Sequence, residues 1–328
     1  MGLLIKGRWH DQWYDTRKSK GEFLRTNSQF RNWITADGSA GPSGESGFPA
    51  EAGRYHLYVS LACPWAHRTL IFRALKSLED IIPVSIVHPY MLDKGWVFDD
   101  WKGETADSLY GFYCLHQLYT RAYPDYSGRV TVPVLWDTEQ ETIVSNESSE
   151  IIRMFNSAFA DLTPEKTDYY PEELRNEIDS INAMIYETLN NGVYRCGFAT
   201  TQEAYQAACS RLFDCLNELE SRLSKQRYLL GEIITEADWR LFTTLVRFDA
   251  VYFSHFKTNK RRMSDYPELS GYVRDLFQQP GIAETVNMEH IKQHYYFSHH
   301  TINPSSIVPE GPELNFSAPH QRHLQFTS

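Results

Sequence analysis

A predicted β-strand runs directly into a predicted helix in the stretch Tyr55-His-Leu-Tyr-Val-Ser-Leu-Ala-Cys-Pro-Trp-Ala-His-Arg68. Apolar and polar or aromatic residues alternate in its first half, which is the two-residue period of a strand. The proline favours a helix start, because the N–H it lacks would have no partner at the first helical position. We therefore expect Cys63 at a helix N-terminus, where the helix dipole and free N–H groups favour a thiolate.

The segments that follow predict a small mixed α/β domain over residues 51–160. A second strand is expected over 81–87, followed by an insertion and then a hairpin formed by 130–136 and 142–145. Asn146-Glu-Ser-Ser-Glu150 has the composition of a helix cap and is followed by apolar residues at helical spacing.

Helical periodicity dominates from about residue 171 and predicts an all-helical domain over 170–290. Leucines and isoleucines at four–three spacing mark one helix over 174–189 and another over 205–223, with Cys209 on the apolar side of the second. Thr235-Glu-Ala-Asp238 is a variant capping box that starts a buried helix. We expect the 1–50 arm to be irregular, and the 291–328 tail to be irregular and aromatic.

Composition excludes several classes of protein. The 328 residues contain 42 acidic against 32 basic side chains, a net charge of −10, which disfavours a general binder of nucleic-acid phosphates. No apolar run approaches the ~20 residues that cross a bilayer, and Met1–His10 shows no secretory signal pattern. We therefore expect neither a membrane nor a nucleic-acid partner.

Cysteine and histidine spacing also bears on the cellular compartment and on metal binding. The five cysteines are odd in number and unpatterned, which favours a reducing cytoplasm over a disulfide framework. His290 and His294 are four residues apart but lack a companion metal motif, so we expect them on a helix surface. No metal site is predicted.

Three short motifs carry candidate chemistry. Cys63 has no second cysteine three residues on, so a mixed disulfide formed there must be resolved by an external thiol; the alternative is a buried structural cysteine. In a thiol-handling domain Val132-Pro133 suits a cis peptide that leaves backbone groups open to an extended ligand; the alternative is an edge strand or bulge. Glu147-Ser148 could hold an amino group and a carboxylate, or simply start a helix.

Taken together, these motifs resemble the glutathione transferase superfamily. The resemblance implies an α/β thioredoxin-like N-terminal domain followed by an all-α domain, with glutathione as co-substrate and a homodimer as the assembly. Cys63-Pro-Trp-Ala66 resembles the cysteine-containing, omega-like branch. The chain is most similar to the glutathionyl-hydroquinone reductases of the Xi class through its long arm and the motifs Gly95-Trp96, Ser127–Pro133, Asn191–Tyr194 and Lys292–Tyr295.

The resemblance also implies roles for individual residues. Cys63 would be the nucleophile, and Tyr194 the tyrosine that donates a proton. Tyr252 and Tyr295 would face the active site, although the adjacent Tyr296 fits the same motif. The glutathione site would be lined by Trp96, Arg129, Val130, Val132, Pro133, Glu147 and Ser148. Taken singly, each tyrosine could instead be a packing residue, and Cys114 and Cys196 receive no role.

The function implied is removal of glutathione from glutathionyl-hydroquinones through a mixed disulfide on Cys63, with release of hydroquinone and oxidised glutathione. One alternative is an omega-like thioltransferase or dehydroascorbate reductase, whose reactions need no proton donor for a ring carbon. Another is a non-enzymatic partner-binding protein, because fold alone does not imply chemistry.

Overall fold

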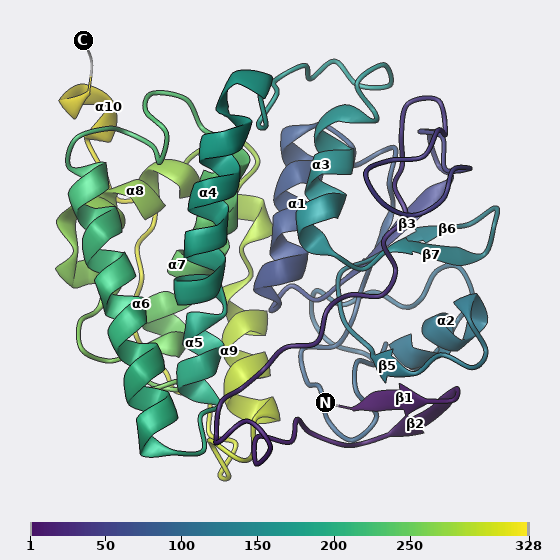
Figure 1. The fold of residues 1–328 in the computed structure, drawn as a ribbon, viewed down its shortest axis with the longest axis horizontal. Coiled ribbons are helices and arrows are strands. Elements are labelled where there is room, and N and C mark those ends of the chain that lie inside the picture. The colour runs from purple at the N-terminus through teal and green to yellow at the C-terminus, as the bar shows by residue number, and fades with distance from the viewer. Residues whose placement is uncertain (1, 327–328) are drawn as a thin grey trace. The chain divides into compact units, whose positions relative to one another are not determined.

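The computed structural model describes residues 2–326, and the chain divides into two compact units. The α/β unit comprises the residues up to 13 together with 26–168 and 285–294. The helical unit comprises 14–25, 169–284 and the residues from 295 onward. Both units are drawn in Figure 1, where the colour follows the residue number.

A four-stranded mixed sheet forms the centre of the α/β unit, in the strand order β4-β3-β6-β7. Strand β3 is parallel to β4 and antiparallel to β6, and β6 is antiparallel to β7. The elements of this part are β3 (Tyr55–Val59), α1 (Pro64–Leu75), β4 (Val84–Ile86), α2 (Leu115–Ala122), β6 (Val134–Asp137), β7 (Thr142–Ser145) and α3 (Ser148–Ser157). Helices α1 and α3 lie side by side (Figure 1). Helix α2 lies within the predicted insertion and was not anticipated.

All five residues of β3 are buried, although alternation with polar residues would suit a strand with one exposed face. The strand is central in the sheet, so both of its faces are covered. His56 is 2% exposed, and its Nε2 lies 2.8 Å from the Ser85 hydroxyl. Burial lowers the pKa of His56 from 6.5 to about 4.

Acid is therefore expected to destabilise the α/β unit through His56. The unfolded chain binds a proton near pH 6.5 and the folded chain only near pH 4, so stability is full above pH 6.5 and is lost as the pH falls. The full shift corresponds to about 3 kcal/mol. Urea unfolding at pH 7.5 and pH 4.5 should show a smaller acid loss for His56→Gln than for the wild type. The exposed His10→Gln serves as the control and should behave like the wild type; equal acid losses in all three proteins would contradict the prediction.

The N-terminal arm was predicted to be irregular, and the structure corrects this, because the arm opens with a β-hairpin. Strands β1 (Leu3–Ile5) and β2 (Arg8–His10) pair with each other, and β1 also pairs with β5 (Gly128–Arg129). The resulting three-stranded sheet has the order β2-β1-β5. The hairpin therefore lies beside Arg129, one of the residues assigned to the ligand site.

The helical unit is a bundle in which α7 contacts both α4 and α8, and α6 contacts α5 and α8. Its α-helices are α4 (Arg175–Ile185), α5 (Gly192–Gly197), α6 (Gln202–Leu223), α7 (Glu236–Arg247), α8 (Pro267–Phe277) and α10 (Arg322–Gln325). Two π-helical turns, Tyr186–Asn190 and Phe248–Tyr252, follow α4 and α7. Short 3-10 turns occur at Glu172–Leu174, Met263–Asp265 and Ala283–Thr285.

The predicted capping box at the start of α7 is confirmed. Asp238 accepts a hydrogen bond from the Thr235 backbone N–H at 2.8 Å, and its other oxygen accepts one from the Tyr272 hydroxyl at 2.8 Å. Both box residues are fully buried, as expected for a helix that enters the centre of a bundle. Cys209 is also buried on α6, in line with its predicted place in the core.

Helix α9 (Met288–Ser298) corrects two predictions. The sequence from residue 291 was expected to be irregular, but it continues this helix. His290 and His294 were expected on a helix surface, but both are buried. Their ring N–H groups donate to the backbone carbonyls of Lys102 and Pro89, at 2.7 and 2.8 Å. Spacing alone could not show that these side chains are covered. The boundary between the two units falls within α9, after His294.

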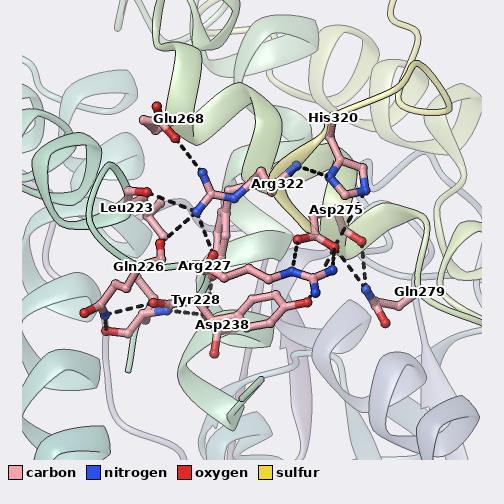
Figure 2. Close-up of polar contacts among 12 residues, drawn as sticks. Leu223, Gln226, Arg227, Tyr228, Asp238, Glu268, Asp275, Gln279, His320 and Arg322 are labelled. Atoms are coloured by element: carbon pink, nitrogen blue, oxygen red, sulfur yellow. Dashed lines mark hydrogen bonds and ion pairs between the residues drawn. The ribbon is translucent and has the colours of Figure 1, made fainter. Parts of the chain in front are cut away.

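Helix α10 is fastened to the rest of the helical unit by a buried arginine. Arg322 is 1% exposed, and it donates to the carbonyl oxygens of Leu223, Gln226 and Arg227 and pairs with Glu268 at 2.7 Å. Figure 2 shows this guanidinium beside a second network, in which Arg227 binds Asp275. Arg322 thus supplies donors to carbonyls at and beyond the end of α6, which lack helical partners.

Replacing Arg322 with Met should lower the free energy of unfolding by about 3 kcal/mol, because the carboxylate and the carbonyls lose their buried partner. Chemical denaturation monitored by circular dichroism measures this loss. Leu324→Ala, on the same short helix and 66% exposed, is the matched control and should change the stability little. Equal stabilities of the two variants would contradict the buried role of Arg322.

Candidate active site

Cys63 is the N-cap residue of α1, as predicted. Its backbone is extended, with φ −74° and ψ 122°, and Pro64 occupies the first turn of the helix. The Cys63 thiol is buried and lies 3.6 Å from the carbonyl oxygen of Val132. The side chain is therefore held at a helix N-terminus, next to the segment that precedes β6.

The peptide bond between Val132 and Pro133 is cis, as we predicted for a thiol-handling domain. The preceding segment is held by Tyr119, whose hydroxyl donates to the Thr131 carbonyl at 2.8 Å and accepts from the Thr131 N–H at 3.2 Å. Tyr119 thereby fixes the backbone that faces the thiol.

Glu147 and Ser148 lie at the start of α3, with Glu147 as the N-cap residue. One carboxylate oxygen accepts from the backbone N–H and the hydroxyl of Ser149, at 3.1 and 2.8 Å, and the other accepts from the Ser28 hydroxyl at 3.1 Å. Burial opposes ionisation of this carboxyl. The hydrogen bonds from Ser149 and Ser28, with the charge of Arg68, nevertheless hold the pKa of Glu147 below its usual value. A negative charge is thus kept in place at this helix start.

Trp96 is buried and stacks on the imidazole of His294, with ring centroids 4.9 Å apart and planes inclined by 24°. The Trp96 backbone carbonyl accepts a hydrogen bond from the Leu115 N–H at 2.9 Å, at the start of α2. Both contacts lie within the α/β unit: the backbone bond holds the Trp96 main chain, and the stacking on His294 orients the indole.

The loop before Trp96 is braced by Trp9 of the N-terminal hairpin. The Trp9 indole N–H donates to the Asp93 carbonyl at 2.8 Å, and its ring stacks on His116 at 4.9 Å. Gly95 has φ +73°, and a Cβ there would lie 2.6 Å from the Trp9 ring. Gly2 covers the same ring, where a Cβ would lie 2.4 Å from it. Trp9 thus fills the space that two glycines leave open.

Arg129 ends β5, an edge strand of the three-stranded sheet, and Val130 follows it. The Arg129 guanidinium donates to the Gln12 backbone carbonyl, which ties β5 to the arm that follows the hairpin. The Val130 side chain is buried. The assigned ligand residues of the α/β unit therefore come from strand ends, helix starts and the loop before α2.

The three predicted tyrosines form a hydrogen-bonded triad in the helical unit. The Tyr295 hydroxyl lies 2.5 Å from that of Tyr194 and 3.1 Å from that of Tyr252. Tyr194 comes from α5, Tyr252 ends a π-helical turn and Tyr295 comes from α9. Tyr252 lies in a π-helical turn, and the helix that carries Tyr194 follows another. Such turns are frequent at functional sites.

The structure separates Tyr295 from Tyr296. The Tyr296 hydroxyl contacts the Ser254 hydroxyl and donates to the Ala250 carbonyl at 3.2 Å, outside the triad. Tyr295 is 1% exposed, and burial together with the neighbouring phenols Tyr194 and Tyr252 raises its pKa well above the usual value. Tyr295 is therefore a neutral phenol at neutral pH.

Several residues around these groups were not anticipated. Trp9 and His294 support Trp96, Ser28 binds Glu147, and Arg25 lies over the ring of Tyr194. Most of these contacts join segments far apart in the chain, so no local sequence signal marks them.

The remaining cysteines are all buried, and all five are free thiols. Cys114 is the N-cap residue of α2, and its N–H donates to Gln117 at 2.8 Å. Cys196 on α5 neighbours Cys209 on α6, and this neighbour together with burial raises the pKa of the Cys196 thiol. These positions give both cysteines structural contacts. Over residues 2–326, no group of acidic, histidine or cysteine side chains could hold a metal ion.

Two regions of the chain match models of known protein families. Residues 62–158 match the model of the glutathione S-transferase N-terminal domain, and residues 202–275 match that of the C-terminal domain. In the described part of the chain, no helix combines the length and apolar character needed to cross a membrane.

Individual proteins are similar over nearly the full length. The glutathionyl-hydroquinone reductase YqjG of Escherichia coli K12 is 59% identical over 99% of this chain and 100% of its own length. The glutathionyl-hydroquinone reductase PcpF of Sphingobium chlorophenolicum is 55% identical over 95% and 96%. The glutathione-bound structure of YqjG superposes with a TM-score of 0.93, at 56% identity over 99% of this chain and 100% of that one. A Xi-class glutathione transferase from Natrialba magadii superposes at 0.90, with 48% identity over 99% and 97%.

Proposed function

This chain belongs to the glutathione S-transferase family, and we propose that it acts in that family as a glutathionyl-hydroquinone reductase. Glutathione would be its co-substrate and aromatic glutathione conjugates its substrates. The observation that carries the proposal is the triad of Tyr194, Tyr252 and Tyr295 in a chain whose Cys63 begins a helix. A thiolate removes the glutathionyl group, and a phenol supplies the proton that the ring needs.

The first half of the reaction would take place on Cys63. Its thiolate attacks the thioether sulfur of the conjugate, forming a mixed disulfide with glutathione as the bond from sulfur to the ring carbon breaks. The electron pair of that bond goes to the ring, which is reduced to hydroquinone when it gains a proton. Tyr194 donates that proton. Its hydroxyl is bound directly to that of Tyr295, which in turn is bound to that of Tyr252.

The second half returns the enzyme to its starting state. The thiolate of a second glutathione attacks the mixed disulfide, oxidised glutathione leaves and the Cys63 thiolate is regenerated. No second cysteine follows Cys63 in its helix, which agrees with resolution by an external thiol. The scheme predicts ping-pong kinetics.

The residues at the strand and helix ends would bind glutathione. Glu147 is held as a carboxylate and suits the ammonium group of the peptide, while Ser148 and the N–H groups of α3 suit its carboxylate. The Val132 backbone beside the cis Pro133 suits an extended peptide. Trp96 would lie over that peptide, with Arg129 and Val130 at the rim of the site.

We also propose a cytoplasmic location and a homodimer without a metal cofactor. The five free cysteines agree with a reducing compartment in which glutathione is abundant. The proposed division of the chain is an arm over 1–50, a thioredoxin-like domain over 51–160, a helical domain over 170–290 and a tail over 291–328. The tail would serve the active site through Tyr295.

A turnover assay of the purified protein tests the proposed activity. A glutathionyl-hydroquinone is supplied with glutathione, and hydroquinone and oxidised glutathione are followed by liquid chromatography. We expect both products in equal amounts. Reduction of a glutathione mixed disulfide without any release of hydroquinone would overturn the proposal and favour a thioltransferase.

A further inference from the structure

An arginine from the N-terminal arm lies over the tyrosine at one end of the triad. The Arg25 guanidinium carbon is 5.2 Å from the centroid of the Tyr194 ring. The Arg25 Nε donates to the Asn191 side-chain oxygen at 3.3 Å, and Asn191 is buried at the start of the helix that carries Tyr194. The guanidinium is also 5.9 Å from the Phe23 ring. These three contacts hold the guanidinium within the helical unit.

The two hydrogen bonds of the triad take a single direction once Tyr194 loses its proton. A phenol hydroxyl carries one proton, so Tyr295 can donate to only one of its two neighbours. If Tyr194 loses its proton, Tyr295 donates to Tyr194 over the 2.5 Å contact, and Tyr252 donates to Tyr295 over the 3.1 Å contact. Both hydrogen bonds then point toward the Tyr194 oxygen, and such aligned bonds strengthen one another.

We infer that Arg25 is a positioning residue for the proposed reaction: it stabilises the negative charge that develops on Tyr194 as this residue gives its proton to the substrate ring. The inference rests on the proposed function and adds a residue to it. The O–H bond of Tyr194 breaks, its proton joins the ring carbon that loses sulfur, and the phenolate later regains a proton from solvent.

Charge and geometry both support this role. A guanidinium over an aromatic face is attracted to the π-electrons, and the attraction grows when the ring becomes a phenolate with a full negative charge. Arg25 is half-buried, so solvent screens its charge less than that of a fully exposed arginine. The interaction is stronger after proton donation than before it, which is the condition for accelerating that step.

Replacing Arg25 with Met is expected to lower kcat for hydroquinone release roughly tenfold, equivalent to about 1.4 kcal/mol, and to change the KM for glutathione less than twofold. Reduction of a glutathione mixed disulfide by the same variant should keep its wild-type rate, because that reaction needs no ring proton. Arg25→Lys retains the cation and should recover most of kcat.

The matched control is Arg17→Met, which removes an arginine from the same arm whose side chain is 91% exposed. This control should match the wild type in both reactions. The pH profile gives a further readout: the alkaline limb should move to higher pH in Arg25→Met but not in Arg17→Met. Arg247, His255 and His299 also face the triad and are unchanged in both variants, so the difference isolates Arg25.

Distinct results separate this inference from the proposed function. If the wild type releases no hydroquinone, the proposed function is overturned. If Tyr194→Phe releases it normally, the proton-donor role of Tyr194 is overturned, and the role of Arg25 with it. If neither result occurs but Arg25→Met matches Arg17→Met, or Arg25→Lys loses as much as Arg25→Met, the inference alone is overturned. Equal losses of both reactions in Arg25→Met would assign Arg25 a purely structural role and would also overturn it.

Discussion

Cys63→Ser is expected to reduce hydroquinone release to the uncatalysed background. A serine hydroxyl is not ionised at neutral pH and cannot form the mixed disulfide, so the first half of the reaction has no nucleophile. The change removes one sulfur from a helix N-cap position that also accepts serine, so the fold should persist. Steady-state turnover and intact-protein mass after incubation with the conjugate measure the effect. The wild type should gain the mass of one glutathionyl group and the variant should gain none.

Cys114→Ser provides the matched control for this experiment. Cys114 is also buried and is also the N-cap residue of a helix in the α/β unit, but we assign it no chemistry. It should keep near-wild-type turnover and still form the mixed disulfide on Cys63. Substantial reductase activity in Cys63→Ser would show that the mechanism is wrong. Loss of activity in both variants would point to the helix caps and not to the thiol.

Tyr194→Phe should have the second-largest effect, and it should be selective. The variant lacks the hydroxyl that donates the ring proton, so we expect kcat for hydroquinone release to fall by about 10²- to 10⁴-fold, the usual contribution of a general acid. Reduction of a glutathione mixed disulfide requires no such proton and should continue. Parallel assays of the two reactions on one preparation measure the ratio.

Tyr296→Phe is the control for the tyrosine experiment, because its hydroxyl is bound to Ser254 and Ala250 and not to the triad. It should leave the ratio of the two reactions unchanged. If Tyr194→Phe lowers both reactions equally, the special role of Tyr194 is lost and an omega-like thioltransferase becomes the better interpretation. The pair of variants thus tests the enzyme class as well as the residue.

Local sequence predicted the parts of the fold that depend on local interactions. The helix after Cys63, the cap at Glu147 and the capping box at Thr235 are set by residues within one or two turns, and all three are present. The cis peptide bond between Val132 and Pro133 was also predicted, because the chain carries a candidate reactive cysteine. The first three of these features are determined by backbone chemistry close to the residue concerned, whereas the cis peptide was predicted from a cysteine far away in the sequence.

Features that depend on distant segments could not be read from the sequence. His290 and His294 have the spacing of an exposed helix face, and only the fold brings the carbonyls of Lys102 and Pro89 to their rings. The aromatic composition likewise suggested an irregular tail from residue 291, but Tyr295 belongs to a continuous helix. Trp9 and Arg25 contact residues that are distant in the sequence, so no periodic pattern in the sequence reveals their support.

The contact between Trp9 and two glycines has a consequence for natural variation. The indole fills space that Gly2 and Gly95 leave open from opposite ends of a long sequence interval, so Trp9 should occur with glycine at both positions. In a relative that replaces Trp9 with a small side chain, position 2 would stay restricted, because a Cβ there would also lie 2.4 Å from the backbone carbonyl oxygen of His10. Position 95 would stay restricted by its positive φ. Relatives that carry Trp9 should therefore carry both glycines, and the glycines should persist where Trp9 is lost.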